Sequence, residues 1–452
     1  MKFIITILLS LLISCSLEPK YITPKSPIPL NDSGGDTFQI KFIDFFQNDE
    51  IKAIVNIALQ NNKDIQLASV NIETAIETFN VKRADLLPSF GIVASDAAQG
   101  APPAFAAFTP KNTYRSNITL TTFELDFFGK LRNLKKSAKQ SYLATSEARN
   151  VVMTLIVSQT VNAYLQLIAD KQSIGITQNA MQEQRNKLLI LQQRYENGHI
   201  SNAELIAEKI VLETMKASET SYQRLFAQDL HLLMLLTASF DEKKLKPYFE
   251  NIQIDEVKFN VKSLINIPSS ALLNRPDIKQ AEFKLKAMNA NIGVARAAFF
   301  PSILLTGNYG YTSRDFTTLF DNSSWAFTPQ VNIPIFTAGR NMANLSIAKL
   351  QKKTEIINYE KAIQVAFREF LDASSNYQNS NIQLVNYQNI VELNEQMHKI
   401  VKHKMADGIT DSIILANSSI QLLSSKQNLV NQKKESLAST VAIYKSLGGG
   451  GN

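Results

Sequence analysis

The chain has 452 residues, of which 45% are hydrophobic and 19% charged, with a net charge of +7 and one cysteine. This length suits two or three ordinary domains or one large repeated one. Lys and Arg are scattered among Asp and Glu, so the positive charge indicates solvated helix faces and not a nucleic-acid surface. One cysteine excludes an internal disulfide, and no run of about 18 consecutive apolar residues predicts a membrane-spanning helix.

The N-terminus carries a predicted export signal over residues 1–14. Lys2 supplies a positive start, and residues 3–13 form an apolar core that is too short to span a membrane. Cys15 ends this core in a run, Leu12 to Cys15, that resembles a bacterial lipoprotein signal. The resemblance implies cleavage before Cys15, a diacylglycerol and an acyl chain on it, and no other cofactor. Ser16 is similar to the residue found in lipoproteins sent to the outer membrane.

An internal repeat organises the rest of the chain. Residues 58–90 match residues 271–303 without gaps at a shift of 213. Phe128 then matches Phe336 at a shift of 208, and Gly198 matches Gly408 at a shift of 210. Each half has the same order of elements, so we predict two equivalent repeats. The predicted boundaries are a proline-rich leader at 15–44, a first repeat at 45–240, a connecting segment at 241–267, a second repeat at 268–447 and a glycine-rich tail at 448–452.

Each repeat contains a long helix. No proline occurs between Gly129 and Phe240, and apolar residues recur at the three- and four-residue spacing of coiled coils. A continuous helix from Lys130 to Asn197 would extend about 100 Å. Helices of that length cannot wrap a compact core, so they must pack along one another.

Each long helix should turn back on itself at a glycine. Gly198 and Gly408 suit the left-handed residue that ends a helix, and Ser201 and Asp411 suit the N-cap of the next one. We therefore predict a helical hairpin in each half, with tips near 197–201 and 407–411.

Two pairs of strands are predicted between the helices. Alternating apolar and polar residues over about ten positions, with Tyr and Trp near the ends, are the weak signature of membrane strands. Solvent-exposed hairpins are the alternative. The alternation changes phase near Thr121, which indicates a bulge or a strand end. The four segments are 89–97, 115–127, 302–312 and 325–335.

Four membrane strands imply an oligomer. They cannot close into a barrel, and an open sheet edge in lipid leaves backbone groups unpaired at several kcal/mol each. Two copies give eight strands, whose interior side chains nearly fill the barrel, whereas three copies leave a lumen. This argument favours a trimer.

Four segments resemble the outer-membrane efflux proteins of the TolC type, in the OprM/NodT-like lipoprotein branch. The leader from Cys15 to Pro24 resembles that branch's anchor, and Phe123 to Arg132 resembles its strand-to-helix junction. Residues 268–306 are similar to the family pattern almost throughout, and so is the ending from Tyr444 to Gly450. The resemblance covers residues 15–452 in order.

The resemblance implies a mainly α-helical protomer with membrane β-strands. A homotrimer would form a barrel of twelve strands in the outer membrane, continued by a periplasmic α-helical barrel. The helical tips would meet a periplasmic adaptor and, through it, an inner-membrane pump, often of the proton-driven RND type. The residues expected at these tips are Gly198, Ser201, Gly408 and Asp411.

The family closes its periplasmic aperture just past the second tip glycine. Several members have acidic residues where this chain has Ile414 and Asn417, and a tyrosine and an arginine link where it has Met405 and Thr410. We therefore hypothesise a seal made by the apolar side chains, with Asn417 as a neutral polar ring. The apolar residues of this hypothesis are Ile413, Ile414 and Leu415. Arg194 and Tyr195, before the other tip, could supply a polar link instead, or could simply pack between helices.

Two other classes of function are less compatible with the sequence. No nucleotide, hydrolase or zinc motif accompanies the four histidines, and His398 and His403 lie about 140° apart around a helix. An enzyme is therefore not expected. A structural or adhesive coiled-coil lipoprotein of the envelope is the alternative, but it does not require the duplicated strand pairs.

Overall fold

The computed structural model describes residues 16–28, 42–100, 102, 112–260 and 269–449. The chain divides into two compact units, each built from separate stretches of sequence. Unit 1 comprises residues 1–25, 70–146 and 280–361, and unit 2 comprises residues 26–69, 147–279 and 362–452. Each unit contains parts of both predicted repeats, whose sequence boundaries stay a prediction. The export signal and Cys15 lie outside the described residues.

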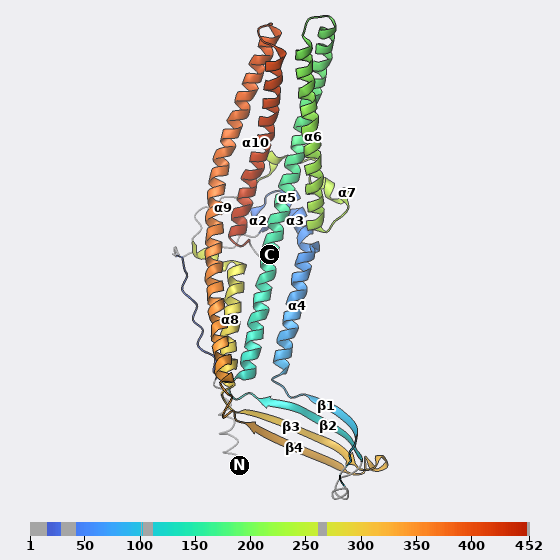
Figure 1. The fold of residues 1–452 in the computed structure, drawn as a ribbon, viewed down its shortest axis with the longest axis vertical. Helices are drawn as coiled ribbons and strands as arrows, with labels where there is room; N and C mark the ends of the chain where they lie inside the picture. Colours follow the sequence, from blue (N-terminus) through green and yellow to red (C-terminus); the bar gives the residue numbers. More distant parts are fainter. Residues whose placement is uncertain (1–15, 29–41, 101, 103–111, 261–268, 450–452) are drawn as a thin grey trace. The chain divides into compact units, whose positions relative to one another are not determined.

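Unit 1 contains a four-stranded antiparallel sheet in the order β1-β2-β3-β4 (Figure 1). All four predicted strands are confirmed, with ends that shift by one to three residues. The strands are β1 (Phe90–Ala98), β2 (Asn112–Leu125), β3 (Ser302–Ser313) and β4 (Ser323–Asn332).

The predicted irregularity near Thr121 is a bulge in β2. The register with β3 shifts between Leu120 and Phe123, so the apolar alternation resumes on the same face after the bulge. β2 ends earlier than predicted because Asp126 caps the following helix. Its carboxylate accepts hydrogen bonds from the backbone nitrogens of Leu131 and Arg132 at 3.0 and 2.9 Å.

The long helices form the predicted hairpins. α5 and α9 each contain 67 residues, which corresponds to about 100 Å of helix. α6 returns along α5 and α10 along α9 (Figure 1). The helices are α2 (Phe42–Phe45), α3 (Asp49–Asn61), α4 (Lys63–Ala84), α5 (Lys130–Glu196), α6 (Asn202–Thr237), α7 (Glu242–Leu245), α8 (Pro276–Ala297), α9 (Arg340–Ala406) and α10 (Ser412–Ser446), with short 3₁₀ turns at Lys246–Tyr248, Ile254–Glu256, Ser269–Asn274 and Phe316–Thr318.

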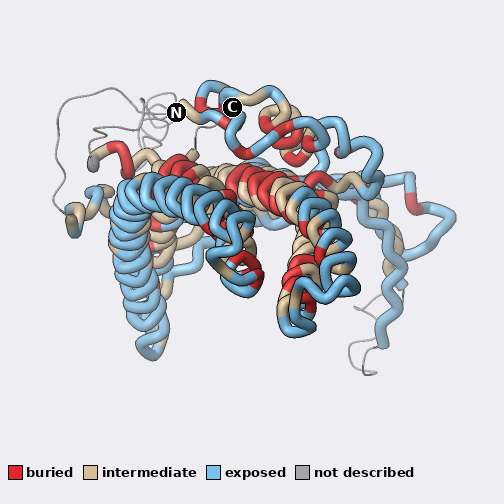
Figure 2. The backbone as a smooth tube through the Cα atoms, turned by 90° about the horizontal axis from the view of Figure 1, so that it is seen from above, coloured by how far each residue is buried: buried red, intermediate tan, exposed pale blue. Residues whose placement is uncertain are grey.

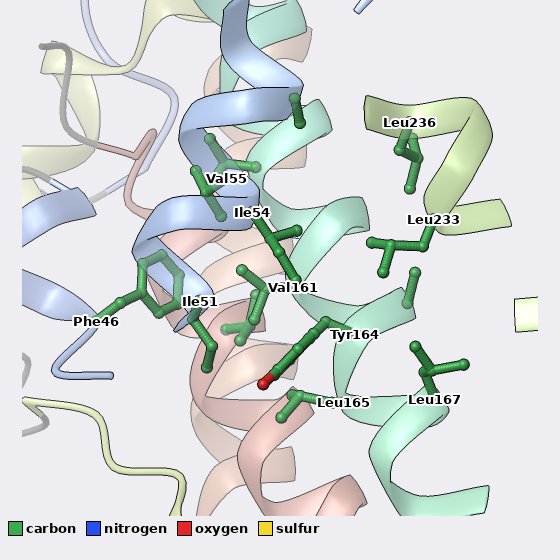
Figure 3. Close-up of a cluster of buried hydrophobic side chains, with 14 of the residues drawn as sticks. Phe46, Ile51, Ile54, Val55, Val161, Tyr164, Leu165, Leu167, Leu233 and Leu236 are labelled. Carbon is green, nitrogen blue, oxygen red and sulfur yellow. The ribbon is translucent and has the colours of Figure 1, made fainter. Parts of the chain in front are cut away.

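The main hydrophobic core lies in unit 2. Side chains from α3, α5 and α6 meet around Tyr164, which is 1% exposed (Figure 3). Its hydroxyl donates to the carbonyl of Tyr248 at 2.7 Å, which satisfies the one polar atom that this ring buries. Phe45 stacks on Tyr444 with ring centroids 4.8 Å apart. Residues from α2 and α10, far apart in the sequence, are thus packed into one core.

One stretch of α5 is apolar enough to cross a membrane by length and composition, with a mean hydropathy of 1.5 over 18 residues. The prediction from the sequence required a run of consecutive apolar residues, which is a stricter criterion, and therefore included no such stretch. In the structure 56% of this window is buried, and α5 supplies many side chains of the unit 2 core. Helix packing therefore explains its hydropathy. Figure 2 shows that buried and exposed residues alternate along the long helices, and most residues of α9 are exposed or half-buried.

Candidate functional site

One face of the β-sheet is apolar and exposed. Ile92, Ile118, Tyr309 and Trp325 face one another in a row across the four strands. They are 79%, 54%, 62% and 76% exposed, respectively. A sheet with a solvent-exposed apolar face across its full width matches the lipid-facing side of a membrane sheet. A second row on this face consists of Phe90, Leu120, Gly307 and Phe327.

The two outer strands each have one free edge. β1 pairs with β2 and β4 pairs with β3, and among the described strands neither has a second neighbour. A free edge presents a row of unpaired N–H and C=O groups that can bind a further strand.

The junction between strands and helices contains one pair of aromatic side chains in contact and one equivalent pair that is exposed. Phe128, after β2, stacks on Phe300, before β3, with ring centroids 4.7 Å apart. Their repeat equivalents, at shifts of 208 and 213, are Phe336 and Leu87. These two side chains are 87% and 68% exposed. The contact that joins the two halves inside one protomer thus has an equivalent pair with nothing covering it.

The leader is bound to unit 1 through Glu18. Its carboxylate accepts hydrogen bonds from Lys136 Nζ at 2.6 Å and from Asn289 Nδ2 at 2.9 Å. A Cβ atom at Gly293 would lie 2.3 Å from Asn133 Nδ2 and 3.1 Å from the Glu18 Cα. Glycine at this position therefore allows the leader to lie close to α8.

The first described residue of the leader lies at the strand-to-helix junction of unit 1. The Ser16 Cα is 3.4 Å from the place that a Cβ on Gly129 would occupy. Arg296 Nη1 donates to the carbonyl of Leu17 at 3.1 Å.

The two hairpin tips have the same geometry. Gly198 and Gly408 adopt positive φ values of 74° and 71°, as predicted. Ser201 and Asp411 are the N-caps of α6 and α10, and each side chain accepts a backbone hydrogen bond. Glu204 completes a capping box by accepting from the Ser201 nitrogen at 2.8 Å. The four predicted tip residues therefore stabilise the two turns, and their contact with a partner stays a prediction.

The structure places the predicted aperture residues around the second tip. Ile414 and Asn417 are exposed and lie one turn apart near the start of α10, while Met405 and Thr410 are half-buried. Leu415 is only 6% exposed and faces its own protomer. Ile413 and Ile414, at 41% and 50% exposed, are the apolar side chains that remain accessible at this tip, and the seal stays a prediction.

A buried ion pair inside the first hairpin has no counterpart among the predicted residues. Lys187 Nζ lies 2.5 Å from Glu208 Oε1, and Glu208 is completely buried. Gln184 donates to the same carboxylate at 2.7 Å. Burial lowers the pKa of Lys187, and Glu208 opposes this shift. Lys187 and Glu208 lie about equally far from Gly198 along the sequence, on either side of it. Opposite charges placed in this way around a predicted hairpin tip are a sequence signal that could have identified the ion pair.

The second hairpin has a hydrogen bond between neutral side chains at the position equivalent to this ion pair. His398 Nδ1 lies 3.0 Å from Ser418 Oγ. Burial lowers the pKa of His398, and Lys187 and Lys402 lower it further. The imidazole is therefore neutral near pH 7. Arg194 and Tyr195 form no ion pair or side-chain hydrogen bond with the described residues, so a polar link at the first tip stays a prediction.

A buried carboxyl group on α5 lies near a half-buried one on α6. Asp170 is 1% exposed, accepts a hydrogen bond from Gln166 at 3.1 Å, and faces Asp229. Burial and the neighbouring Asp229 raise the pKa of Asp170 to about 7, while Gln166 and Lys434 lower it. Below about pH 7 the Asp170 carboxyl therefore keeps its proton.

This pair predicts a specific pH dependence of stability. Between about pH 4 and 7 the folded chain keeps a proton that the unfolded chain has released, so stability falls as pH rises. Asp170→Asn keeps a donor and removes the charge. It should raise the melting temperature at pH 8 and leave it nearly unchanged at pH 4, measured by circular dichroism. Asp372→Asn, at a 67% exposed side chain, is the matched control. A gain from Asp170→Asn that is equal at both pH values would contradict the assignment.

The described residues contain no group of three or more His, Cys, Asp or Glu side chains that could hold a metal ion. His398 hydrogen-bonds Ser418, and His403 lies in the last turn of α9.

A family model described as "Outer membrane efflux protein" matches residues 54–239 and 267–449. The chain is 31% identical over 454 residues to the "Probable efflux pump outer membrane protein TtgC" of Pseudomonas putida, covering 96% of this chain and 93% of the relative. It is also 31% identical over 450 residues to the "Cation efflux system protein CusC" of Escherichia coli, with 97% and 96% covered.

Solved structures are similar over the same length. A membrane protein from Pseudomonas aeruginosa matches with a TM-score of 0.90 and 28% identity, covering 96% of this chain and 98% of that one. The open state of the MtrE outer membrane channel of Neisseria gonorrhoeae matches with a TM-score of 0.85 and 26% identity, with 96% and 98% covered.

Proposed function

Since the chain belongs to the outer membrane efflux protein family and is an outer membrane channel of an efflux system, we propose that three copies share one barrel through which small molecules leave. Its four strands and long helices have the TolC-like fold of such channels. An enzymatic role is excluded by the family, which is non-enzymatic.

The apolar row across the sheet carries this proposal. Ile92 to Trp325 form a lipid-facing band that ends at two free edges, and neither edge can be left unpaired in lipid. β4 of one copy pairs with β1 of the next, which satisfies both edges. Three copies of four strands make a closed barrel of twelve that leaves an open lumen.

The internal repeat predicts which residues meet at each seam, the place where the sheets of two neighbouring copies join. Inside one copy Leu125 lies opposite Ile303, and the repeat shifts of 208 and 213 convert this pair into Ile333 and Phe90. Phe336 of one copy then packs on Leu87 of the next, as Phe128 packs on Phe300. The proposed contact between two copies therefore has the same geometry as the contact between the two halves of one copy.

The helices of unit 2 supply a second seam. Leu371, Ile382 and Leu393 recur every eleven residues on α9, so they share one face, and they are 51%, 62% and 63% exposed. An uncovered apolar face of this length requires a partner in water. On α6, Ile210 and Leu235 are similarly exposed, at 58% and 61%. Contact between these faces of neighbouring copies closes the helical part of the duct.

The lipid on Cys15 is proposed to assist membrane attachment. The Glu18 contacts with Lys136 and Asn289 bind the leader beside the strand-to-helix junction, where the strands reach the membrane surface. Two or more acyl chains are enough for stable anchoring, whereas one is marginal. The barrel spans the membrane by itself, so the lipid adds to an anchorage already present.

The tips are proposed to contact a periplasmic adaptor, which connects them to an inner-membrane pump of the RND type. Gly198 and Gly408 present two equivalent capped turns in each copy. The names of the relatives mention toluene, antibiotics and cations, but a permissive lumen leaves the choice of cargo to the pump. A coiled-coil structural lipoprotein would not need the apolar sheet face.

The test combines electrophoresis with planar bilayers. The purified protein should migrate as a trimer before boiling and as a monomer afterwards, and it should conduct ions when inserted into a bilayer. A monomer in mild detergent without conductance would contradict the proposed duct.

A further inference from the structure

A cavity of about 670 Å³ lies between the two helical hairpins of unit 2. α5 forms one wall, and α9 and α10 form the other. Its volume falls within the range of small-molecule pockets, about 300 to 1,000 Å³. Among its apolar lining residues are Ile176, Leu191, Met215, Met405, Leu415 and Leu423.

An apolar cluster closes part of this cavity. Met215 and Leu423 line it and also belong to a buried core that joins α5, α6 and α10, where they are 2% and 7% exposed. A ligand in the cavity therefore meets preformed apolar surface from both hairpins, as binding sites for organic molecules usually provide.

The charged side chains of the cavity are mostly cationic. Lys187, Lys426, Arg194 and Lys402 line it, against one carboxylate, Glu183. Lys187 and Lys426 are paired with carboxylates at 2.5 and 2.8 Å. Arg194 and Lys402 make no ion pair with the described residues, so two positive charges remain for a ligand.

The pKa of His398 is affected by the charged side chains around the cavity. It lines the same cavity, and after burial itself the lysines at 187, 402 and 426 lower its pKa, whereas Glu183 alone raises it. The charges that act on this imidazole are therefore mainly cationic. This also argues against a soft metal ion, although His398, Met215 and Met405 would otherwise be suitable ligands.

We propose that this cavity binds a small organic anion with an apolar body, such as an aromatic sulfonate or carboxylate. Arg194 on α5 and Lys402 on α9 bind the acidic group, and the apolar lining residues bind the body. The occupant contacts both hairpins of one copy. The site lies within a single chain, so it does not depend on the proposed trimer.

Equilibrium dialysis of the full-length protein in phosphatidylcholine nanodiscs tests this site. The probe is naphthalene-1-sulfonate, and 1-naphthylmethylammonium is a matched probe of opposite charge. After subtraction of empty nanodiscs, the sulfonate should bind saturably, once per chain and at least about tenfold more tightly than the ammonium. Equal affinities, or no saturable binding, would overturn the proposal.

Variants separate the charge from the cavity. The double variant Arg194→Gln/Lys402→Gln should weaken sulfonate binding by at least about tenfold, because it removes two charge-assisted contacts. Both side chains are exposed and unpaired, so folding should be unaffected. Lys402→Arg should retain the affinity, and Lys349→Gln, at an exposed lysine outside the cavity, should not change it.

Ser419→Phe fills the cavity and should abolish binding of both probes. Sulfonate binding that survives Ser419→Phe would place the ligand elsewhere and refute the site.

Discussion

Replacing Arg275 by methionine will lower the free energy of unfolding by about 3 kcal/mol or more. Arg275 is 6% exposed and forms ion pairs with Asp277 at 2.6 Å and Glu369 at 2.7 Å. Its Nη1 also donates to the carbonyl of Ser446 at 2.6 Å. The guanidinium thus links the start of α8 to α9 and to the end of α10, and methionine removes the donor that these three acceptors share.

Thermal unfolding monitored by circular dichroism measures this loss as a lower melting temperature. Arg275→Lys should lose less, because it keeps the charge but not the forked geometry. The matched control is Arg368→Met, since Arg368 is 74% exposed and 3.8 Å from Asp372. Surface substitutions of this kind change stability by about 0.5 kcal/mol or less. An Arg275→Met loss no larger than that of the control would contradict this role.

Asn417→Asp will make the channel sensitive to block by divalent cations from the periplasmic side. Asn417 is exposed near the start of α10. In the proposed trimer the substitution places three carboxylates around one axis, where like charges close together attract a compensating cation. Single-channel recording with Ca²⁺ or Mg²⁺ should show block of the variant and little effect on the unsubstituted protein.

The matched control is Gln60→Glu, which adds the same charge on the exposed surface of α3. It should leave the response to divalent cations unchanged. Strong block of the unsubstituted channel would show that its aperture is not neutral, and block of both variants would show that the position of the charge is immaterial. The first result would contradict a neutral aperture, and the second would remove Asn417 from it.

Local sequence signals predicted the parts of the fold that depend on neighbouring residues. Alternation located four strands within three residues of their ends, and the phase change at Thr121 located the bulge. Gly198, Gly408, Ser201 and Asp411 identified both tips, because a positive φ and an N-cap restrict the residue type.

Contacts between residues far apart in the sequence were not predictable in the same way. Arg275 reaches Glu369, and Glu18 reaches Asn289, and neither pair leaves a periodic pattern. Leu415 belongs to the predicted apolar seal, but the helix turns its side chain inward, which its place in the sequence did not show. The raised pKa of Asp170 depends first on its own burial and then on Asp229 of another helix, and the packing of α5 and α6 provides both.

Disulfide formation between copies tests the shared barrel most directly. Phe90→Cys and Ile333→Cys introduce cysteines at the two sheet edges that the repeat places opposite each other, at positions 68% and 63% exposed in one copy. After oxidation in outer membranes, the double variant should give covalent dimers and trimers on denaturing gels. The single variants, like the chain with only Cys15, should give no trimer. A double variant that stays monomeric while Leu125→Cys/Ile303→Cys forms its bond within the chain would contradict a barrel shared between copies.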